Sequence, residues 1–166
     1  NKGTNDRQLK NTGVQSVVHW RSQVGAMQNE LELGVRWHAD DVVRTHTEHP
    51  WDMVDGRVVK REGVATETVL DSHNAAQALA IHVSDDLGVG PVRVLPGVRH
   101  EIITTRTGST ATGPDDPQTH RVWLPGLGVF YKVSDSLGLL ASANQGFSPI
   151  PPGSAEDAEP ETAWNY

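Results

Sequence analysis

Four arginines stand at positions where their side chains could bind an anion. A guanidinium presents a planar fork of N–H donors that matches a carboxylate with two parallel hydrogen bonds. The same side chains could instead form ion pairs with acids such as Glu32 and Glu101 inside a hydrated cavity. The sequence leaves both roles open for these four residues, which are Arg21, Arg36, Arg93 and Arg99.

Scattered histidines raise the question of a metal site. His46 and His49 form the one closely spaced pair, in the run His-Thr-Glu-His. A zinc site needs three or four ligands, and no third ligand follows this pair at a diagnostic spacing. We therefore expect no bound metal and interpret the histidines as solvated, namely His38, His46, His49, His73 and His82.

Neither the motifs nor the composition point to catalysis or to a nucleic-acid partner. The sequence has no paired nucleophile and base, no glycine-rich phosphate loop and no zinc signature, so we expect no enzyme and no cofactor. It has no cysteine, which excludes disulfides and thiolate metal ligands. A net charge of −7 argues against nucleic acid, because a phosphate-binding surface needs clustered Lys and Arg.

Six stretches that position these side chains alternate between apolar and polar residues. A period of two indicates β-strands that separate two environments. In the first stretch Val18 and Trp20 share one face and Arg21 lies on the other. The apolar faces of these stretches contain no Asp, Glu, Lys or Arg. The stretches are residues 14–24, 31–40, 77–83, 92–103, 124–133 and 137–144.

The connections between the six stretches alternate in length. Short turns are expected near Gly25, at 85–91 and at 134–136, and long polar loops at 41–74, at 104–118 and after Gly146. Residues 1–12 are expected to end a preceding loop. Pro96 lies inside a predicted strand, where it cannot donate to the ladder, so we expect a β-bulge there. Short turns on one rim and long loops on the other are typical of transmembrane β-barrels.

Hydropathy is consistent with that architecture. No window approaches the roughly 18 consecutive apolar residues that a membrane helix needs, and the mean hydropathy is −0.45. Barrel strands dilute the apolar signal because only alternate residues face lipid. Trp37 and Tyr131 are expected near opposite ends of the apolar face, where barrels carry interfacial aromatic residues.

Two long stretches carry a resemblance to a known family. They are LPGLGVFYKVSDSLGLLASANQGFSPIPPGSAEDAEPETAWNY at 124–166 and AAQALAIHVSDDLGVGPVRVLPGVRHEII at 75–103. Their order and spacing resemble the barrel region of TonB-dependent outer-membrane receptors, especially the ferric-citrate and siderophore transporters. The sequence departs from the family at His100, where these receptors usually have Tyr.

This resemblance implies an all-β fold of antiparallel up-and-down strands. Residues 1–166 would form a partial TonB-dependent receptor-like barrel domain, since about six strands cannot close a barrel and receptors of this type have about 22 strands around a plug. The plug domain and the remaining strands would be absent from the chain. The protein would reside in the outer membrane of a Gram-negative cell, contact lipid, and import a ferric chelate with energy from TonB, which would act through the plug. Arg21, Arg36, Arg93 and Arg99 would face the lumen and could contact the chelate.

Two other functions are compatible with the alternating pattern. A soluble or surface-attached antiparallel β-domain could bind a partner through its long loops, with the apolar faces buried in a two-layer core. A passive porin-like barrel would share the sheet and lack the energised plug. The long loops favour a barrel over a sandwich, in which turns recur every 8–12 residues.

Overall fold

The computed structural model describes residues 2–114, 116–150 and 160–166, and its regular elements are all β-strands. Six long strands dominate, and four short strands complete the set. The strands are β1 (Lys2–Val24), β2 (Met27–His49), β3 (Trp51–Val54), β4 (Arg57–Lys60), β5 (Glu67–Val89), β6 (Val92–Ser109), β7 (Gly113–Pro114), β8 (Gln118–Lys132), β9 (Gly138–Ser148) and β10 (Glu161–Asn165).

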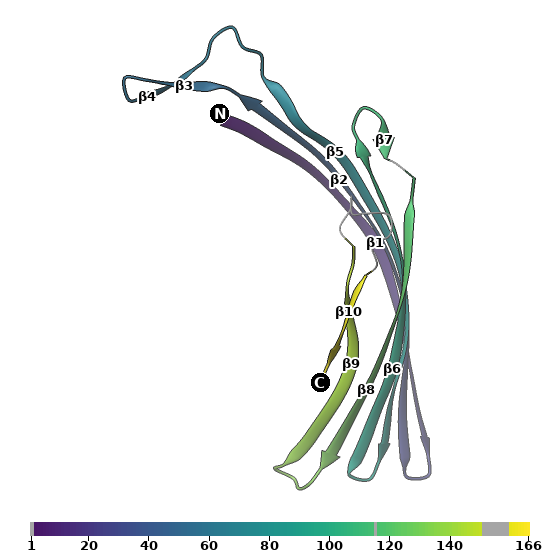
Figure 1. The fold of residues 1–166 in the computed structure, drawn as a ribbon. Coiled ribbons are helices and arrows are strands. Elements are labelled where there is room, and N and C mark those ends of the chain that lie inside the picture. The colour runs from purple at the N-terminus through teal and green to yellow at the C-terminus, as the bar shows by residue number, and fades with distance from the viewer. Residues whose placement is uncertain (1, 115, 151–159) are drawn as a thin grey trace.

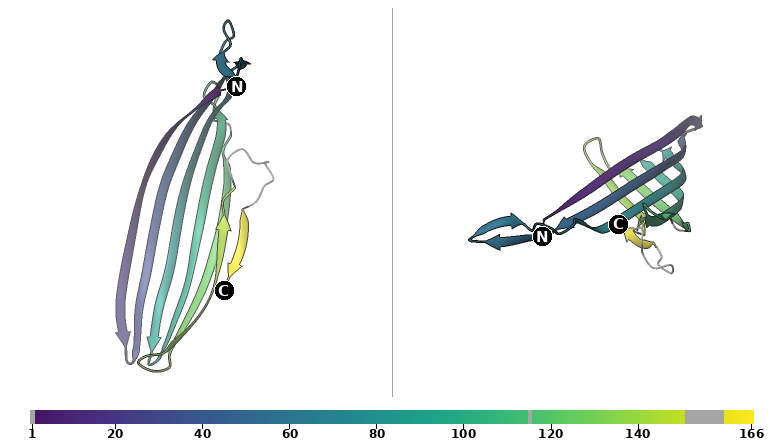
Figure 2. Two further views of the ribbon diagram at one scale, coloured as in Figure 1. Left: turned by 90° about the vertical axis from the view of Figure 1, so that its left-hand side faces the viewer. Right: turned by 90° about the horizontal axis from the view of Figure 1, so that it is seen from above.

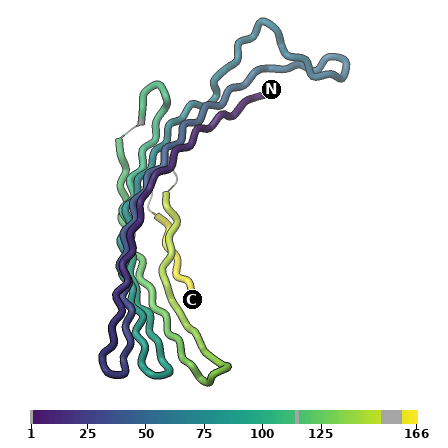
Figure 3. Tube along the Cα trace, turned by 180° about the vertical axis from the view of Figure 1, so that it is seen from behind, coloured from purple at the N-terminus to yellow at the C-terminus, as the bar shows by residue number. Residues whose placement is uncertain are grey.

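One curved antiparallel sheet contains all of the long strands, in the order β1-β2-β5-β6-β8-β9-β10 (Figure 1). Consecutive long strands are neighbours, so the topology is up-and-down, as the sequence predicts. β7 pairs with β6, and β3 and β4 form a separate two-stranded sheet. The views in Figures 2 and 3 show a curved wall that remains open between β1 and β10.

The two faces of this wall differ in polarity, because successive side chains of a strand point to opposite sides. Strand register identifies which residues share a face. The apolar face contains the row Val18, Leu33, Val83 and Val98. The polar face contains the adjacent row Val17, Gly34, His82 and Arg99.

The polar face is the concave side of the sheet. Gly34, Ala78, Ala80, Glu101 and Val122 are the buried residues of the long strands among those described, apart from His49 at the outer end of β2. All five lie on the polar face, and Ala80, Glu101 and Val122 form one row across β5, β6 and β8. Side chains converge on the concave side of a curved sheet and diverge on its convex side, which explains this burial.

Aromatic residues lie toward both ends of the apolar face. Trp37 pairs with Leu79 toward the outer end, whereas Tyr131 is in the row next to the hairpin turns. Trp123 adds a second outer aromatic residue, and the ring of His100 stacks on it at a centroid distance of 4.1 Å. His100 therefore has an aromatic partner at the position where the sequence departs from the family pattern.

The strands are longer than the hydropathy pattern predicts. β1 begins at Lys2 instead of Val14, and much of the expected loop at 41–74 belongs to β2 and β5. The expected loop at 104–118 likewise contains the end of β6, and β10 was not expected at all. These extensions are polar on both sides, so they lack alternation, but their ladders continue through pairs such as Thr4 and Thr47. Residues 151–159 of the expected final loop lie outside the described part of the chain.

The longer strands place some charges on the apolar face. Asp85, expected in a turn, lies opposite Leu31, and both of its carboxylate oxygens accept hydrogen bonds of 2.7 Å from Asn29 Nδ2. Arg121 lies opposite Ile102. Farther out, a row across the strands carries Lys10, Asp41 and Arg106. The interval of β2 from Leu31 to Ala39 has no charge on this face.

The short connections form tight turns at one end of the sheet, opposite the end from which the β3–β4 hairpin projects (Figure 1). Gly25 and Gly90 have φ values of 61° and 56° and supply the left-handed backbone that two-residue turns require. The expected turn at 85–91 is therefore only two residues long, between Val89 and Val92.

The bulge expected at Pro96 is absent. The β5–β6 ladder is interrupted between two pairs, Ser84 with Gly97 and Leu87 with Val94. The interruption leaves two residues unpaired on each strand, whereas a bulge would leave one extra residue on one strand. The proline interrupts the ladder through its missing N–H without inserting a residue. The sheet instead shifts register between β2 and β5 at His46 and Thr47.

Candidate functional site

The four arginines singled out in the sequence share the polar face. Arg21 is in β1, Arg36 in β2, and Arg93 and Arg99 in β6. Register places them on the same side as His82 and Glu101. Their interactions differ, however, because three of them are paired with carboxylates and one is not.

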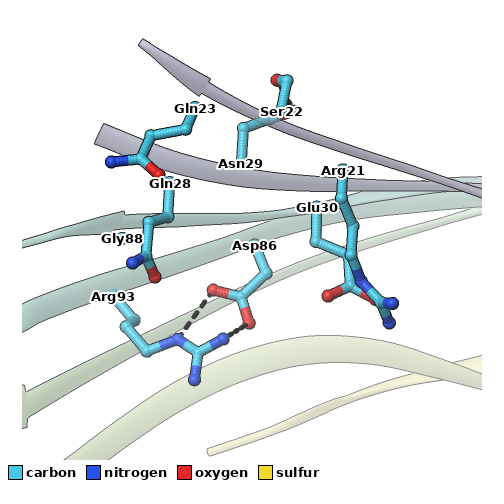
Figure 4. A pocket seen from close by; sticks show the side chains of 9 residues that line it. All are labelled: Arg21, Ser22, Gln23, Gln28, Asn29, Glu30, Asp86, Gly88 and Arg93. Atoms are coloured by element: carbon cyan, nitrogen blue, oxygen red, sulfur yellow. Dashed lines mark hydrogen bonds and ion pairs between the residues drawn. The ribbon is translucent and has the colours of Figure 1, made fainter. Parts of the chain in front are cut away.

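Two of the arginine pairs lie near the hairpin turns, around the pocket drawn in Figure 4. Arg21 donates to Glu30 across the first hairpin at 2.9 Å. Arg93 contacts both oxygens of Asp86 across the second, and its Nε–Oδ1 distance is 2.9 Å. Gln23 and Gln28 add neutral polar groups to the same pocket. Each guanidinium already has an acceptor, so both arginines mainly offset the neighbouring acids.

The third pair is more buried. Arg99 Nε donates to Glu101 Oε1 at 2.6 Å along β6. Glu101 is only 8% exposed, and Ala80 and Val122 flank it in the same row. This carboxylate depends on Arg99 for its charge compensation, because a buried charge without a partner is costly.

Arg36 is the exception among the four. Within the described residues, its side chain has no ion pair and no side-chain hydrogen bond. It lines a shallow hollow on β1 and β2 whose polar members include Gln15, His38 and Asp40. His38 Nε2 lies 3.7 Å from Asp40 Oδ2, so this acid has a neighbour other than Arg36. The guanidinium of Arg36 therefore remains available to an anion from solution.

A chain of histidines and acids crosses the polar face, and no sequence motif indicates it. His82 Nε2 in β5 donates to Glu32 Oε1 at 2.8 Å. His19 in β1 lies 3.6 Å from both Glu30 and Glu32. The imidazole of His82 lies across Gly34, where an added Cβ would be 2.0 Å from the ring. The absence of a side chain at Gly34 thus allows His82 to reach Glu32.

The histidine pair at the outer end of β2 is engaged by the chain itself. His49 Nε2–H donates to the carbonyl of Arg61 at 3.0 Å, and its Nδ1 accepts from the Thr66 hydroxyl at 3.3 Å. His46 lies 3.8 Å from Glu48. Among the described residues, no three His, Asp or Glu side chains are arranged to hold a metal ion. His49 therefore connects the two ends of the segment that carries β3 and β4.

The β3–β4 hairpin contains its own ion pair. Arg61 Nε donates to both oxygens of Asp52, at 3.1 and 3.0 Å. These hydrogen bonds favour the ionised carboxylate and lower the pKa of Asp52 below its usual range. The same contacts raise the pKa of Arg61. Both side chains are accessible to solvent, so the pair makes a modest contribution to the hairpin.

This pair predicts a pH dependence of local order. Since the folded pKa of Asp52 is lowered, its stabilisation is present above the unfolded value of about 3.9 and is lost as the pH falls through the folded value. Amide exchange, corrected for intrinsic rates, should show protection in β3–β4 falling on the order of twofold below about pH 4. Arg61→Gln should show the lower protection already at neutral pH, and an unchanged pH dependence in that variant would contradict the assignment.

The described part of the chain contains no helix long and apolar enough to cross a membrane. A sequence profile described as "TonB dependent receptor-like, beta-barrel" matches residues 1–166. The chain belongs to this family. Outer-membrane residence is the location that membership implies.

Solved structures of other receptors have the same fold as this receptor chain. Unliganded FecA, a ferric citrate transporter, matches with a TM-score of 0.82 and 20% identity over 98% of this chain and 25% of its own. BauA, the ferric preacinetobactin receptor from Acinetobacter baumannii, gives 0.72 and 12% over 98% and 26%. The ferric-catecholate import receptor Fiu from E. coli gives 0.68 and 14% over 96% and 28%. The receptor chain thus spans about a quarter of the length of these structures.

Proposed function

We propose that this chain forms wall and outer loops of an outer-membrane receptor that imports a ferric chelate, either ferric citrate or a siderophore complex. The observation that carries this proposal is Arg36, an unpaired guanidinium on the polar face of a receptor barrel wall. The three similar structures named above are receptors or transporters for ferric chelates, which supports the choice of substrate class. The role is transport, with iron as cargo.

The four arginines contribute differently to this function. Arg36 would donate a fork of hydrogen bonds to a carboxylate or another anionic oxygen of the chelate. Arg21, Arg93 and Arg99 already donate to acids, so a chelate would have to compete with Glu30, Asp86 or Glu101 for them. We therefore assign ligand contact to Arg36 and a mainly structural role to the other three.

The apolar face would contact membrane lipid. The nine residues from Leu31 to Ala39 extend roughly 30 Å at about 3.4 Å each. A strand tilted by about 40° would then cross an apolar layer of about 25 Å, which is the height expected of outer-membrane barrels. We place lumen closure and the contact with TonB in parts of the whole protein beyond this chain. TonB would act through a plug domain to release the chelate inward.

Uptake by the full-length receptor tests this function. The receptor is expressed in a Gram-negative host that lacks its own ferric-chelate receptors, and cells are supplied with radioactive iron as ferric citrate or as a catecholate complex. We expect uptake of one of these chelates that requires TonB. Arg36→Ala should raise the half-saturating concentration about tenfold or more, because a charged hydrogen-bond donor is lost, and Arg36→Lys should recover part of this loss.

Arg93→Lys serves as the matched control, since Arg93 is already paired with Asp86. This variant should leave the half-saturating concentration within about twofold of wild type. Iron uptake that persists in cells without TonB would instead indicate a passive pore. Equal effects of the Arg36 and Arg93 variants would contradict the assignment of ligand contact to Arg36.

A further inference from the structure

Two arginines face each other at the outer end of the polar face. Arg7 of β1 and Arg44 of β2 are direct partners in the antiparallel ladder. They lie an even number of residues from Arg21 and Arg36 on the same strands, so they share the polar face. Directly opposite residues of an antiparallel pair have Cβ atoms about 4.5–5.5 Å apart, and like charges in such positions repel each other.

Other opposed charges of the sheet mostly have a partner of opposite sign, although Glu48 and Glu67 also lie opposite each other, with His46 at 3.8 Å from Glu48. Arg21 lies opposite Glu30 and Lys10 opposite Asp41. Glu30 also lies opposite Asp86, but each of these two acids has an arginine partner.

The pair of Arg7 and Arg44 has no such compensation. Arg44 Nε donates to the neutral side chain of Asn5 at 3.0 Å. Within the described residues, neither guanidinium has a carboxylate at ion-pair distance. The sheet therefore holds two adjacent positive charges whose repulsion a bound anion would relieve.

This pair is separate from the hollow around Arg36. Arg44 lies eight residues farther along β2, roughly 27 Å at about 3.4 Å per residue. It also lies beyond Asp41, where the apolar face ends in charged residues. Ser72 of β5 is opposite Arg44 and extends the polar row across a third strand. The row of Arg7, Arg44 and Ser72 therefore lies beyond the uncharged part of the apolar face and carries two positive charges.

We propose that Arg7 and Arg44 form an anion-binding site for a multivalent oxyanion carrying carboxylate or phosphate groups. Two guanidinium forks can each donate paired hydrogen bonds to such an anion. The Asn5 amide and the Ser72 hydroxyl are neighbouring neutral groups that can complete its coordination. The site does not depend on the ferric-chelate function proposed above, because it follows from the register and charges of β1 and β2 alone.

Thermal unfolding of the full-length receptor in detergent at low ionic strength tests this site. The probes are iron-free citrate and inorganic phosphate. Comparing the responses to the two anions distinguishes recognition of carboxylate from recognition of phosphate. Either anion should raise the melting temperature of the wild-type receptor. Arg7→Gln and Arg44→Gln should each weaken the apparent affinity for that anion about tenfold or more.

Arg7→Glu provides the decisive variant, because it places an opposite charge across from Arg44. It should raise the melting temperature without added anion and abolish the response to anions, a combination that simple loss of structure cannot produce. Lys10→Gln, which removes a positive charge from the apolar face, should retain the response. No anion response in wild type, or an equal response in wild type and Arg7→Glu, would overturn the proposal. If the receptor shows the anion-dependent rise in melting temperature but imports no iron, the transport function is refuted and the anion site stands.

Discussion

Arg in place of Val18 should destabilise the receptor by about 2–4 kcal/mol, whereas Arg in place of Val17 should cost less than about 1 kcal/mol. Both residues are valines in the same strand, and they occupy opposite faces of the sheet. Val18 lies in the row with Leu33 and Val83 on the apolar face, so Val18→Arg would place a charge within the layer that we propose contacts lipid. Val17 lies opposite Gly34 on the polar face, where water can solvate an added guanidinium.

Urea unfolding of the full-length receptor in lipid vesicles measures this difference directly. In a receptor whose other tryptophans are replaced by phenylalanine, Trp20, which shares the apolar face with Val18, reports lipid contact through quenching by brominated lipid chains. Quenching of Trp20 combined with equal stability of the two variants would refute the assignment of faces. A soluble domain with a two-layer core would also be destabilised by Val18→Arg, but its Trp20 would show no quenching by lipid.

The period of two in the sequence was sufficient to predict the central parts of the six long strands and the polarity of their faces. All six predicted stretches are strands, and the parity of Arg21, Arg36, Arg93 and Arg99 places them on one face as expected. Alternation reports a difference between two environments, so it ends where both faces meet water. Strand ends such as residues 2–13 of β1 are held by ladder pairing and a few polar side-chain contacts, and hydropathy could not reveal them.

Contacts within one strand or across a tight turn could in principle be predicted from the sequence. Arg99 and Glu101 are two residues apart on one strand, so they necessarily share a face. The pair Arg21 and Glu30 follows once the turn at Gly25 fixes the register of the first hairpin.

Contacts set by the register between strands that are far apart in the sequence could not be predicted. His82 meets Glu32 only because β2 pairs with β5 across the inserted β3–β4 segment and a register shift. Arg7 and Arg44 were missed for a different reason: the turn at Gly25 also fixes their register, but both lie in stretches that hydropathy assigned to loops. For His82 and Glu32, the pairing of β2 with β5 determines the contact, and no local pattern encodes that pairing.

The second large effect concerns the buried pair on β6. Arg99→Ala should destabilise the receptor by about 2–3 kcal/mol, because it leaves the Glu101 carboxylate, which is 8% exposed, without its hydrogen-bond donor. The cost falls below the 3–5 kcal/mol typical of a fully buried broken pair, since the Arg99 side chain is 38% exposed and water can approach the site. Arg93→Ala, which removes the more exposed partner of Asp86, should cost about 1 kcal/mol or less.

A double-mutant cycle separates this electrostatic cost from lost packing. Glu101→Ala leaves a guanidinium that water can solvate, so it should cost less than Arg99→Ala. The double variant should recover most of the loss, because no buried charge then lacks a partner. Additive effects, with the double variant less stable than Arg99→Ala by the full cost of Glu101→Ala, would show that Arg99 stabilises β6 through contacts other than its pair with Glu101. A coupling of about 1–2 kcal/mol would instead identify the pair as the source of the stability at the most closely packed part of the polar face.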